Sequence, residues 1–233
     1  MFSESLYFPV LRGRNGFFKG VMNHPNPMWV YAGVQRGIRD VLYHPNICDL
    51  AALSVVLGFQ DSYTRGHARR VAAYARRIAQ RMGLPTDYVE TIRIGGLLHD
   101  IGKIAFSPEL ISNTQEKLST AMRAEIQRHP EIGGQFLKAI QVAEPVIDCV
   151  RYHHERQDGS GYPYGLKADE IPLGARIISV ADCFDALSTD RSYQKRRTIA
   201  ESIDIIKSLG NENLSAEFVA QLIIDVCDNG LQA

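Results

Sequence analysis

The amino-acid sequence predicts an all-α protein, and three observations support this fold class. Apolar residues recur at helical spacing in successive segments from residue 47 onward. Helix start and stop signals, such as Ser119, Pro130 and Gly83, divide these segments into helices of ordinary length. No stretch shows the sustained alternation of apolar and polar residues that is typical of a half-buried strand.

The composition is that of an ordinary globular chain. Of the 233 residues, 45% are hydrophobic, so the chain can form a sizeable core. Lys plus Arg and Asp plus Glu both number 26, and the resulting net charge of zero gives no reason to expect binding to a nucleic-acid polymer or to an anionic membrane. No apolar run is long enough for a signal peptide or a membrane span.

The cysteines favour a reducing compartment. Cys48, Cys149, Cys183 and Cys227 lie far apart and form no C-x-x-C motif. This spacing fits reduced core thiols better than a disulfide framework, so we expect a cytoplasmic protein.

Residues 1–46 differ from the rest of the chain. Proline and glycine divide them into loops, with His24-Pro25-Asn26-Pro27 as the clearest break, and one short helix could form over residues 28–43. This is too little for an independent sensor domain. We expect a small N-terminal extension of helix and loop that caps a main domain over residues 47–233, with a truncated or vestigial regulatory module as the alternative.

The first helices of the main domain follow from composition and spacing. Residues 49–60 are apolar and rich in alanine. Residues 67–83 place Val71 and Ile78 on one face and arginines mostly elsewhere, and Gly83 ends this helix.

The later helices are marked mainly by their first residues. Ser119 is an expected N-cap. Pro130 suits the first turn of the next helix, so His129 is expected to end the one before it. A turn-rich loop over residues 158–172 separates two of the helices. The expected helices after Gly83 span residues 85–101, 119–128, 130 onward, 144–155, 173–187, 198–209 and 216–227.

Five of the seven histidines fall in the main domain, at or near the inner ends of expected helices. His67 lies one turn before Val71 on an apolar stripe, and Asp182 lies one turn after Ile178. Any one of these polar residues could be an ordinary buried or helix-end side chain. Together they would be costly to bury apart, because each needs a partner, and metal ions would satisfy all of them at once.

One short segment places a histidine and a carboxylate side by side after an apolar run. His99 and Asp100 offer two metal ligands from adjacent positions, and Lys103 brings a positive charge close to any anion that the metal would bind. A polar pair at a helix end would look the same, so this segment alone does not decide between the two interpretations.

The longer motifs support a family resemblance. The order of His67, His99-Asp100 and Asp182 resembles the HD superfamily of metal-dependent phosphohydrolases. Residues 129–133, HPEIG, are similar to the mid-domain histidine segment of that family. Residues 153–163, HHERQDGSGYP, resemble the HHE…DGxGYP signature of the HD-GYP subfamily. The similarity runs from about residue 61 to about residue 218.

The resemblance implies an HD-domain helical bundle that acts as a cyclic di-GMP phosphodiesterase in bacterial second-messenger signalling. The expected products are linear pGpG and, after a second cleavage, GMP. The resemblance assigns the metal ligands to His67, His99, Asp100, His129, His153, His154 and Asp182.

This ligand set implies two divalent transition-metal ions with Asp100 as the bridge between them. A mixture of imidazoles and carboxylates suits iron or manganese better than magnesium. Two such ions about 4 Å apart can hold a bridging hydroxide that attacks a phosphodiester. Lys103 would act with Asp100 in catalysis by stabilising the charge that develops on the phosphoryl oxygens.

The implied substrate contacts lie in two segments. Gly161, Tyr162 and Pro163 would form a pocket wall beside the paired histidines, since glycine and proline give that loop an unusual but stiff backbone. Arg191 resembles the family arginine that meets the substrate phosphate. The basic residue that follows it in the family pattern is shifted by one position here, to Lys195, which would make the same contact.

Three departures from the family pattern bear on rate and specificity. Tyr63 stands where members with a third metal carry a glutamate, so we expect two metals. Residues 114–116 read Thr-Gln-Glu in place of Lys-Pro-Gly, which removes a positive charge and a stiff turn. Ser192 replaces the proline that usually follows the arginine.

Two alternatives to cyclic di-GMP hydrolysis stay open. The chain could hydrolyse another cyclic dinucleotide, such as cyclic GMP-AMP. It could instead be a catalytically weak module that senses the nucleotide or docks onto signalling-protein partners. The complete ligand set and Lys103 favour an enzyme, because a pure binding module does not need all of them.

Overall fold

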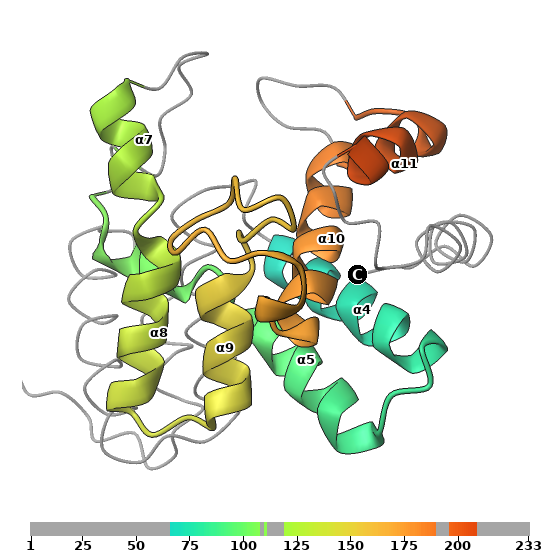
Figure 1. Ribbon diagram of the computed structural model, residues 1–233, viewed down its shortest axis with the longest axis horizontal. Helices are drawn as coiled ribbons and strands as arrows, with labels where there is room; N and C mark the ends of the chain where they lie inside the picture. The colour runs from blue at the N-terminus through green and yellow to red at the C-terminus, as the bar shows by residue number, and fades with distance from the viewer. Residues whose placement is uncertain (1–65, 108–109, 111–118, 190–195, 209–233) are drawn as a thin grey trace, which may run out of the picture. The chain divides into compact units, whose positions relative to one another are not determined.

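The computed structural model describes residues 66–107, 110, 119–189 and 196–208 (Figure 1). Within these ranges the chain is helical and contains no strand; its β structure is one isolated antiparallel bridge between Asp158 and Lys167. The prediction of an all-α fold is therefore confirmed for this part of the chain.

The structure describes seven α-helices and two 3₁₀ turns within these ranges. They are α4 (His67–Arg81), α5 (Thr86–Leu98), the 3₁₀ turn η1 (Ile101–Ala105), α7 (Thr120–Ile126), α8 (His129–Ala139), α9 (Glu144–Tyr152), the 3₁₀ turn η2 (Ala168–Glu170), α10 (Leu173–Ser188) and α11 (Ile199–Ser208).

Helix α4 supplies the clearest apolar face. Its buried residues include Val71, Tyr74 and Ile78, whereas Arg69 and Arg76 are exposed on the other side. Gly83 follows the helix with a φ of 68°, a left-handed angle that glycine adopts without strain. The sequence pattern therefore fixes both the buried face of α4 and its end.

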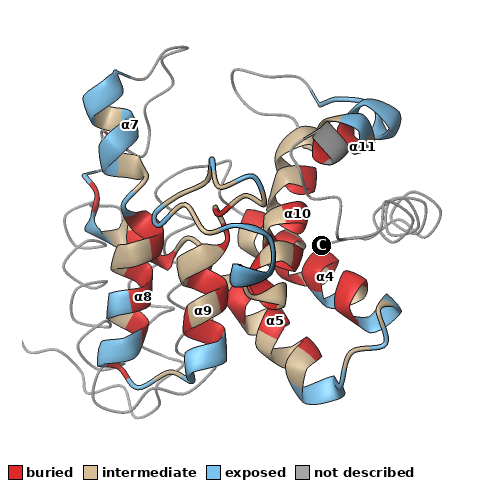
Figure 2. Ribbon diagram, in the orientation of Figure 1, coloured by how far each residue is buried: buried red, intermediate tan, exposed pale blue. Residues whose placement is uncertain are grey.

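The main core forms where α4, α5, α9 and α10 meet, and Figure 2 shows the buried residues concentrated there. Phe184 of α10 is 2% exposed, and its ring meets that of Tyr74 edge to face at 5.2 Å. Ile78 and Ile178 are fully buried beside them. Each such side chain contributes roughly 1.5–3 kcal/mol by leaving water, so this core holds the elements that carry the site.

A second contact joins η1 to the first turn of α8. A Cβ atom added to Gly102 would collide with the carbonyl oxygen of His129 and would lie 2.7 Å from the backbone nitrogen of Gly133. Glycine at position 102 therefore lets the backbone after Asp100 lie directly on the helix that begins at His129.

Helix α9 packs against α8 on one side and against α5 and α10 on the other (Figure 1). Cys149, in the middle of α9, is 1% exposed and lies close to Gly95 and Gly174, where any larger residue would collide with it. The expectation of a core thiol is confirmed for Cys149.

Several helix boundaries differ from those expected, and the helix predicted over residues 144–155 ends at Tyr152. The helix predicted over residues 85–101 ends at Leu98, because the backbone turns at His99 and Asp100 into η1. The prediction that His129 ends a helix was wrong: α7 ends at Ile126, and His129 is the first residue of α8. The helix can begin before Pro130 because proline in a first turn costs no intrahelical hydrogen bond. The expected N-cap at Ser119 is confirmed, since its hydroxyl accepts the N–H of Met122 at 3.2 Å.

Several expectations concern residues outside the described ranges. These are the N-terminal extension and the domain boundary after residue 46, the helices expected over residues 49–60 and 216–227, Tyr63, residues 114–116, Arg191, Ser192 and Lys195. None of the helices that the structure describes combines the length and the apolar character needed to cross a bilayer.

Candidate metal centre

The seven residues expected as metal ligands lie close together in space, although 115 positions separate the first from the last. His67 is the first residue of α4, and His129 is the first residue of α8. His99 and Asp100 follow the last residue of α5, His153 and His154 follow α9, and Asp182 lies within α10. Helix ends suit this purpose because they let a side chain leave the helix cylinder toward a shared point.

One half of the cluster combines imidazoles and carboxylates. Ligand atoms of His67, His99 and Asp100 all lie within 4.8 Å of one another. Asp182 belongs to the same half, since its Oδ1 lies 3.2 Å from His67 Nε2 and 3.9 Å from His99 Nε2. Two imidazoles and two carboxylates therefore face one point.

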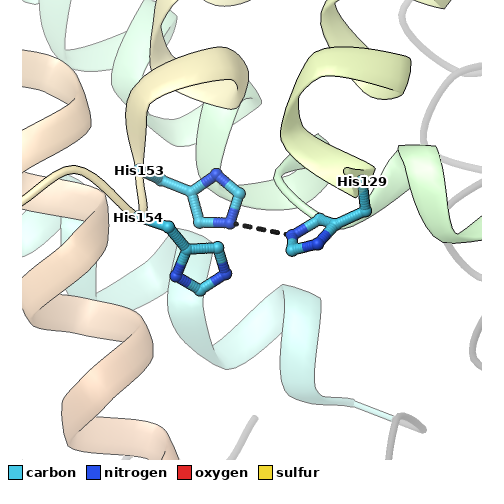
Figure 3. Close-up of side chains that lie close together, drawn as sticks. All are labelled: His129, His153 and His154. Carbon is cyan, nitrogen blue, oxygen red and sulfur yellow. Dashed lines mark hydrogen bonds between the residues drawn. The ribbon is translucent and has the colours of Figure 1, made fainter. Parts of the chain in front are cut away.

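The other half is rich in imidazole. His129, His153 and His154 have ring nitrogens within 4.8 Å of one another, and the rings point inward (Figure 3). The Nε2 atoms of His129 and His153 are 3.4 Å apart. Imidazole nitrogens gathered at this spacing are typical ligands of transition-metal ions.

Asp100 faces both halves. Its Oδ2 lies 3.4 Å from His99 Nε2, and its Oδ1 lies 3.3 Å from His129 Nε2. One carboxylate therefore presents a different oxygen to each half of the cluster. This is the arrangement that a bridge between two metal ions requires.

Backbone carbonyls orient three of the rings. The Nδ1 atoms of His99, His129 and His153 lie 2.7–2.8 Å from the carbonyl oxygens of Gly96, Ile126 and Val150, each three residues earlier. A carbonyl oxygen can only accept, so each Nδ1 carries the hydrogen and each Nε2 keeps its lone pair. This is how a protein presents a histidine to a metal ion.

His67 is oriented by a carboxylate that sequence reasoning missed. Its Nδ1 lies 2.7 Å from Asp185 Oδ2, and Asp185 is fully buried. Arg70 donates two hydrogen bonds to the same carboxylate, at 2.5 and 3.0 Å. The available signal was the position of Asp185 three residues after Asp182, which places both on one face of a helix.

The electrostatics divide the imidazoles into two kinds. Burial lowers the pKa of His129 and of His154 to about 3, and it also holds the pKa of His153 well below its usual value. Burial acts in the same direction on His67, but hydrogen bonds to Asp182 and Asp185 outweigh it and raise its pKa to about 9. The imidazole-rich half is therefore neutral at pH 7 and ready to accept a metal ion, whereas His67 must first release a proton.

The two carboxylates stay ionised in spite of their burial. Burial alone would raise the pKa of Asp100, but the charge of Lys103 is the main influence that holds it well below its usual value. The pKa of Asp182 is likewise lowered against the effect of burial, mainly by its hydrogen bond with His67.

These residues fit divalent metal ions. The Nε2 of His99 is buried and makes no hydrogen bond within the part of the chain that the structure describes, a costly state for a polar atom without a ligand. Two ionised carboxylates and a set of neutral imidazoles supply the anionic and the nitrogen ligands that such ions need. By the chemistry of its donors, the cluster can hold divalent metal ions.

Lys103 lies at the edge of the cluster. Its Nζ is 2.7 Å from Asp100 Oδ2, and 35% of its side chain is exposed. It neutralises part of the charge on the central carboxylate while remaining accessible from solvent.

The Gly-Tyr-Pro loop, residues 156–167, lies against the imidazole-rich half. The ring of Tyr162 stacks on that of His154 at 4.7 Å and 28° and lies 6.5 Å from that of His129. A Cβ atom on Gly161 would collide with the backbone of residues 154–156, so this close approach requires glycine. Pro163 is exposed. The loop therefore covers one side of the cluster.

Glu155 is a second residue that sequence reasoning missed. It is 2% exposed and accepts the backbone N–H groups of Tyr164 and Leu166 at 2.7 and 3.0 Å. A buried carboxylate directly after the paired histidines thus holds the far side of the loop. The motif contained the residue, but the sequence did not show which groups it would meet.

Two curated relatives match a large part of the chain. A cyclic di-GMP phosphodiesterase of Pseudomonas aeruginosa is 42% identical over 166 residues, which cover 70% of this chain and 39% of that protein. A 3'3'-cGAMP-specific phosphodiesterase of Vibrio cholerae is 33% identical over 175 residues, which cover 75% of this chain and 38% of that protein. The chain spans about two fifths of the length of these relatives.

A solved structure and a family model agree on the fold. The structure of an HDG"Y"P protein from Bdellovibrio bacteriovorus has a TM-score of 0.60 with 21% sequence identity and covers 91% of this chain and 77% of that chain. At this identity the likeness concerns the fold alone. The family model described as HD domain matches residues 53–215. Because this match covers most of the chain and includes every described element of the centre, the chain belongs to the HD domain family.

Proposed function

We propose that the chain is an HD-GYP phosphodiesterase that hydrolyses cyclic di-GMP to linear pGpG and, with a second cleavage, to GMP. The observation that carries this proposal is the position of Asp100, which presents one oxygen to each of two ligand clusters. Such a site suits a reaction in which both the attacking and the leaving oxygen of a phosphodiester need stabilisation. The named activity of the Pseudomonas relative supports the choice of substrate.

The seven candidate ligands would hold two divalent ions, iron or manganese. His67, His99 and Asp182 would bind one ion, and His129, His153 and His154 the other, with Asp100 shared. When bound, the ions would activate a water molecule and neutralise charge on the phosphoryl oxygens. The mixed imidazole and carboxylate donors favour these metals over magnesium.

The remaining roles belong to side chains around this centre. Lys103 contacts Asp100 and is accessible, so its ammonium group can stabilise charge on a phosphoryl oxygen bound there. Tyr162 with Gly161 and Pro163 would line the pocket for the dinucleotide beside His154. Arg191 and Lys195 would contact its phosphates, as the family resemblance implies.

The cellular setting completes the proposal. The enzyme would work in the cytoplasm, where its thiols stay reduced. Residues 1–46 would cap the HD-GYP domain over residues 47–233, and signalling proteins would supply the regulatory input.

Anaerobic purification followed by elemental analysis and a turnover assay tests the function. We expect two metal ions per chain and cleavage of cyclic di-GMP by the wild type. His99→Ala should lose metal and turnover, whereas Gln80→Ala, a change at an exposed position of α4, should keep both. Full metal occupancy without turnover under reducing conditions would instead support a nucleotide-sensing or docking module.

A second candidate substrate is cyclic GMP-AMP. The Vibrio relative that covers 75% of this chain is named for that activity, and its own identity to the chain is 33%. Parallel turnover assays with both rings at equal concentration separate the two substrates. A higher kcat/KM for cyclic GMP-AMP would contradict the assignment to cyclic di-GMP while leaving the metal chemistry intact.

A further inference from the structure

The Gly-Tyr-Pro loop is attached to the helices through a residue outside the sequence motif. The backbone N–H of Tyr164, directly after Pro163, donates to Glu155 Oε1 at 2.7 Å. Its phenolic hydroxyl donates to Glu131 Oε2 on α8. Its ring lies 5.8 Å from that of Tyr152 at the end of α9. Tyr164 therefore ties the loop to two helices at once.

The two acceptors are themselves held in place. Glu155 is buried and also accepts the N–H of Leu166. Glu131 accepts a hydrogen bond from the side chain of Gln135 at 2.9 Å, one turn further along α8. Each acceptor lies within two residues of a candidate ligand, since Glu155 follows His154 and Glu131 follows His129 by two positions. The anchors of the loop and the ligands of the centre thus share the same two chain segments.

The attachment has a direct consequence for Tyr162. Its ring stacks on His154, and its backbone N–H donates to the carbonyl oxygen of His154 at 3.2 Å. Tyr164 itself is 53% exposed, so burial of its ring does not account for its position. The polar contacts of Tyr164 account for its position. Tyr164 lies two residues after Tyr162, whose ring stacks on His154 and covers the centre.

We propose that Tyr164 is a positioning residue, which locks the Gly-Tyr-Pro loop onto α8 and α9 and thereby holds Tyr162 against His154 at the wall of the substrate pocket. The effect on the substrate rests on the proposed function; the effect on the loop does not. Because the hydroxyl bond to Glu131 is exposed, its loss should loosen the loop without unfolding the bundle.

The variant Tyr164→Phe removes this hydroxyl and keeps the ring and the backbone. Amide hydrogen exchange of metal-loaded protein, followed by mass spectrometry with fragmentation to single residues, should show exchange at Tyr162 and Leu166 about fivefold faster than in the wild type, the change expected for one lost hydrogen bond. The matched control is Ser160→Ala, which removes an exposed hydroxyl bond to Asp158 within the same loop. It should leave both amides unchanged, and unchanged exchange in Tyr164→Phe would overturn the proposal.

A double-mutant cycle identifies the acceptor. Glu131→Ala should accelerate exchange at the same amides, and adding Tyr164→Phe should change nothing further, because the hydroxyl of Tyr164 then has no acceptor left to lose. Additive effects would mean that the hydroxyl of Tyr164 and Glu131 act separately, contrary to the proposal.

Steady-state kinetics with cyclic di-GMP test the link to the pocket. In Tyr164→Phe we expect KM to rise about fivefold, the same factor as the loop opening, with kcat within about twofold and metal content unchanged. Faster exchange with an unaltered KM would overturn the role in positioning the pocket wall. If the wild type cleaves no cyclic dinucleotide, the proposed function fails, and amide exchange still decides whether Tyr164 holds the loop.

Discussion

At the scale of single residues, four of the seven candidate ligands are imidazoles whose Nδ1 atom already has a partner. His99, His129 and His153 each use Nδ1 on a backbone carbonyl of their own chain segment, so Nε2 is left for the centre. His67 uses a buried carboxylate instead of a carbonyl. Hydrogen bonds to Asp182 and to this carboxylate raise the pKa of His67, whereas burial lowers the pKa values of His129 and His153.

The carboxylate behind His67 gives a first prediction. Asp185→Asn keeps the shape of the side chain but removes the charge that His67 and Arg70 share. We expect metal affinity to fall about 10–100-fold, because such a carboxylate orients the imidazole and raises its basicity. Competition with a chelator of known affinity measures this change. Asp204→Asn, on the exposed face of α11, is the control, and equal affinities in the two variants would contradict the role of Asp185.

A second prediction concerns Gly102. In Gly102→Ala the new methyl group collides with the carbonyl oxygen of His129, so either η1 or α8 must move. We expect a loss of about 1–3 kcal/mol in unfolding free energy together with reduced metal content, because the residues on both sides of the collision carry ligands. Denaturant unfolding and elemental analysis measure the two effects.

Gly83→Ala is the informative comparison. A methyl group there meets nothing within 4 Å, but the φ of 68° strains any residue other than glycine. This variant should lose stability and keep its metal. Metal loss in both variants would show that general destabilisation, and not the contact with His129, empties the centre.

At the scale of elements, α9 connects the core to the centre. Its middle is buried between α5 and α10 at Cys149, and its end carries His153 and His154. The packing of the middle therefore sets where the two imidazoles lie. The same helix is followed directly by Glu155 and the loop that covers the cluster.

The thiol of Cys149 reports on the packing of α9. Burial raises its pKa to about 12, and the thiolate is the reactive form. We expect no alkylation of Cys149 by iodoacetamide between pH 8 and about 10 in the native protein, and rapid alkylation in denaturant. Peptide mass spectrometry after timed labelling measures this. Labelling of the native protein at the rate seen in denaturant would mean that α9 opens readily.

At the scale of the whole molecule, the centre brings together buried carboxylate charges, which metal ions would neutralise, and buried imidazoles, which metal ions would bind. In metal-free protein the neutral state of His129, His153 and His154 is imposed by burial. The unfolded chain would bind protons at these positions below pH 6.5, whereas the native state would not. Their contribution to stability is therefore present above pH 6.5 and is lost as the pH falls.

This gives a pH prediction for chelator-treated protein. His67 acts in the opposite direction, since its raised pKa stabilises the native state below pH 6.5 and the effect disappears as the pH rises toward 9. Below pH 6.5 the contribution of His67 is constant, because it is protonated in both states, so the three lowered groups set the slope and the unfolding free energy should fall by at most about 4 kcal/mol per pH unit. Urea titrations at pH 5 and 7 measure the change. Equal stability at both values would contradict the burial of three neutral imidazoles.

Local sequence patterns were sufficient for most of the helices. Val71 and Ile78 repeat at helical spacing, Ser119 caps a helix, and Gly83 ends one, and all of these depend only on near neighbours in the chain. The predicted boundary at His129 was wrong because it, too, was based only on near neighbours. Whether a helix begins or ends beside a proline depends on what its first turn packs against. Here that turn packs against Gly102.

The sequence by itself determined the all-α class, the family and the identities of the candidate ligands, since helical spacing and long motifs are written in consecutive residues. Only the tertiary structure decided that Asp100 presents one oxygen to each cluster, that Asp185 lies behind His67, and that Tyr164 joins the loop to two helices. These contacts join residues up to 118 positions apart. Their geometry depends on how the helices pack, and no local pattern encodes that packing.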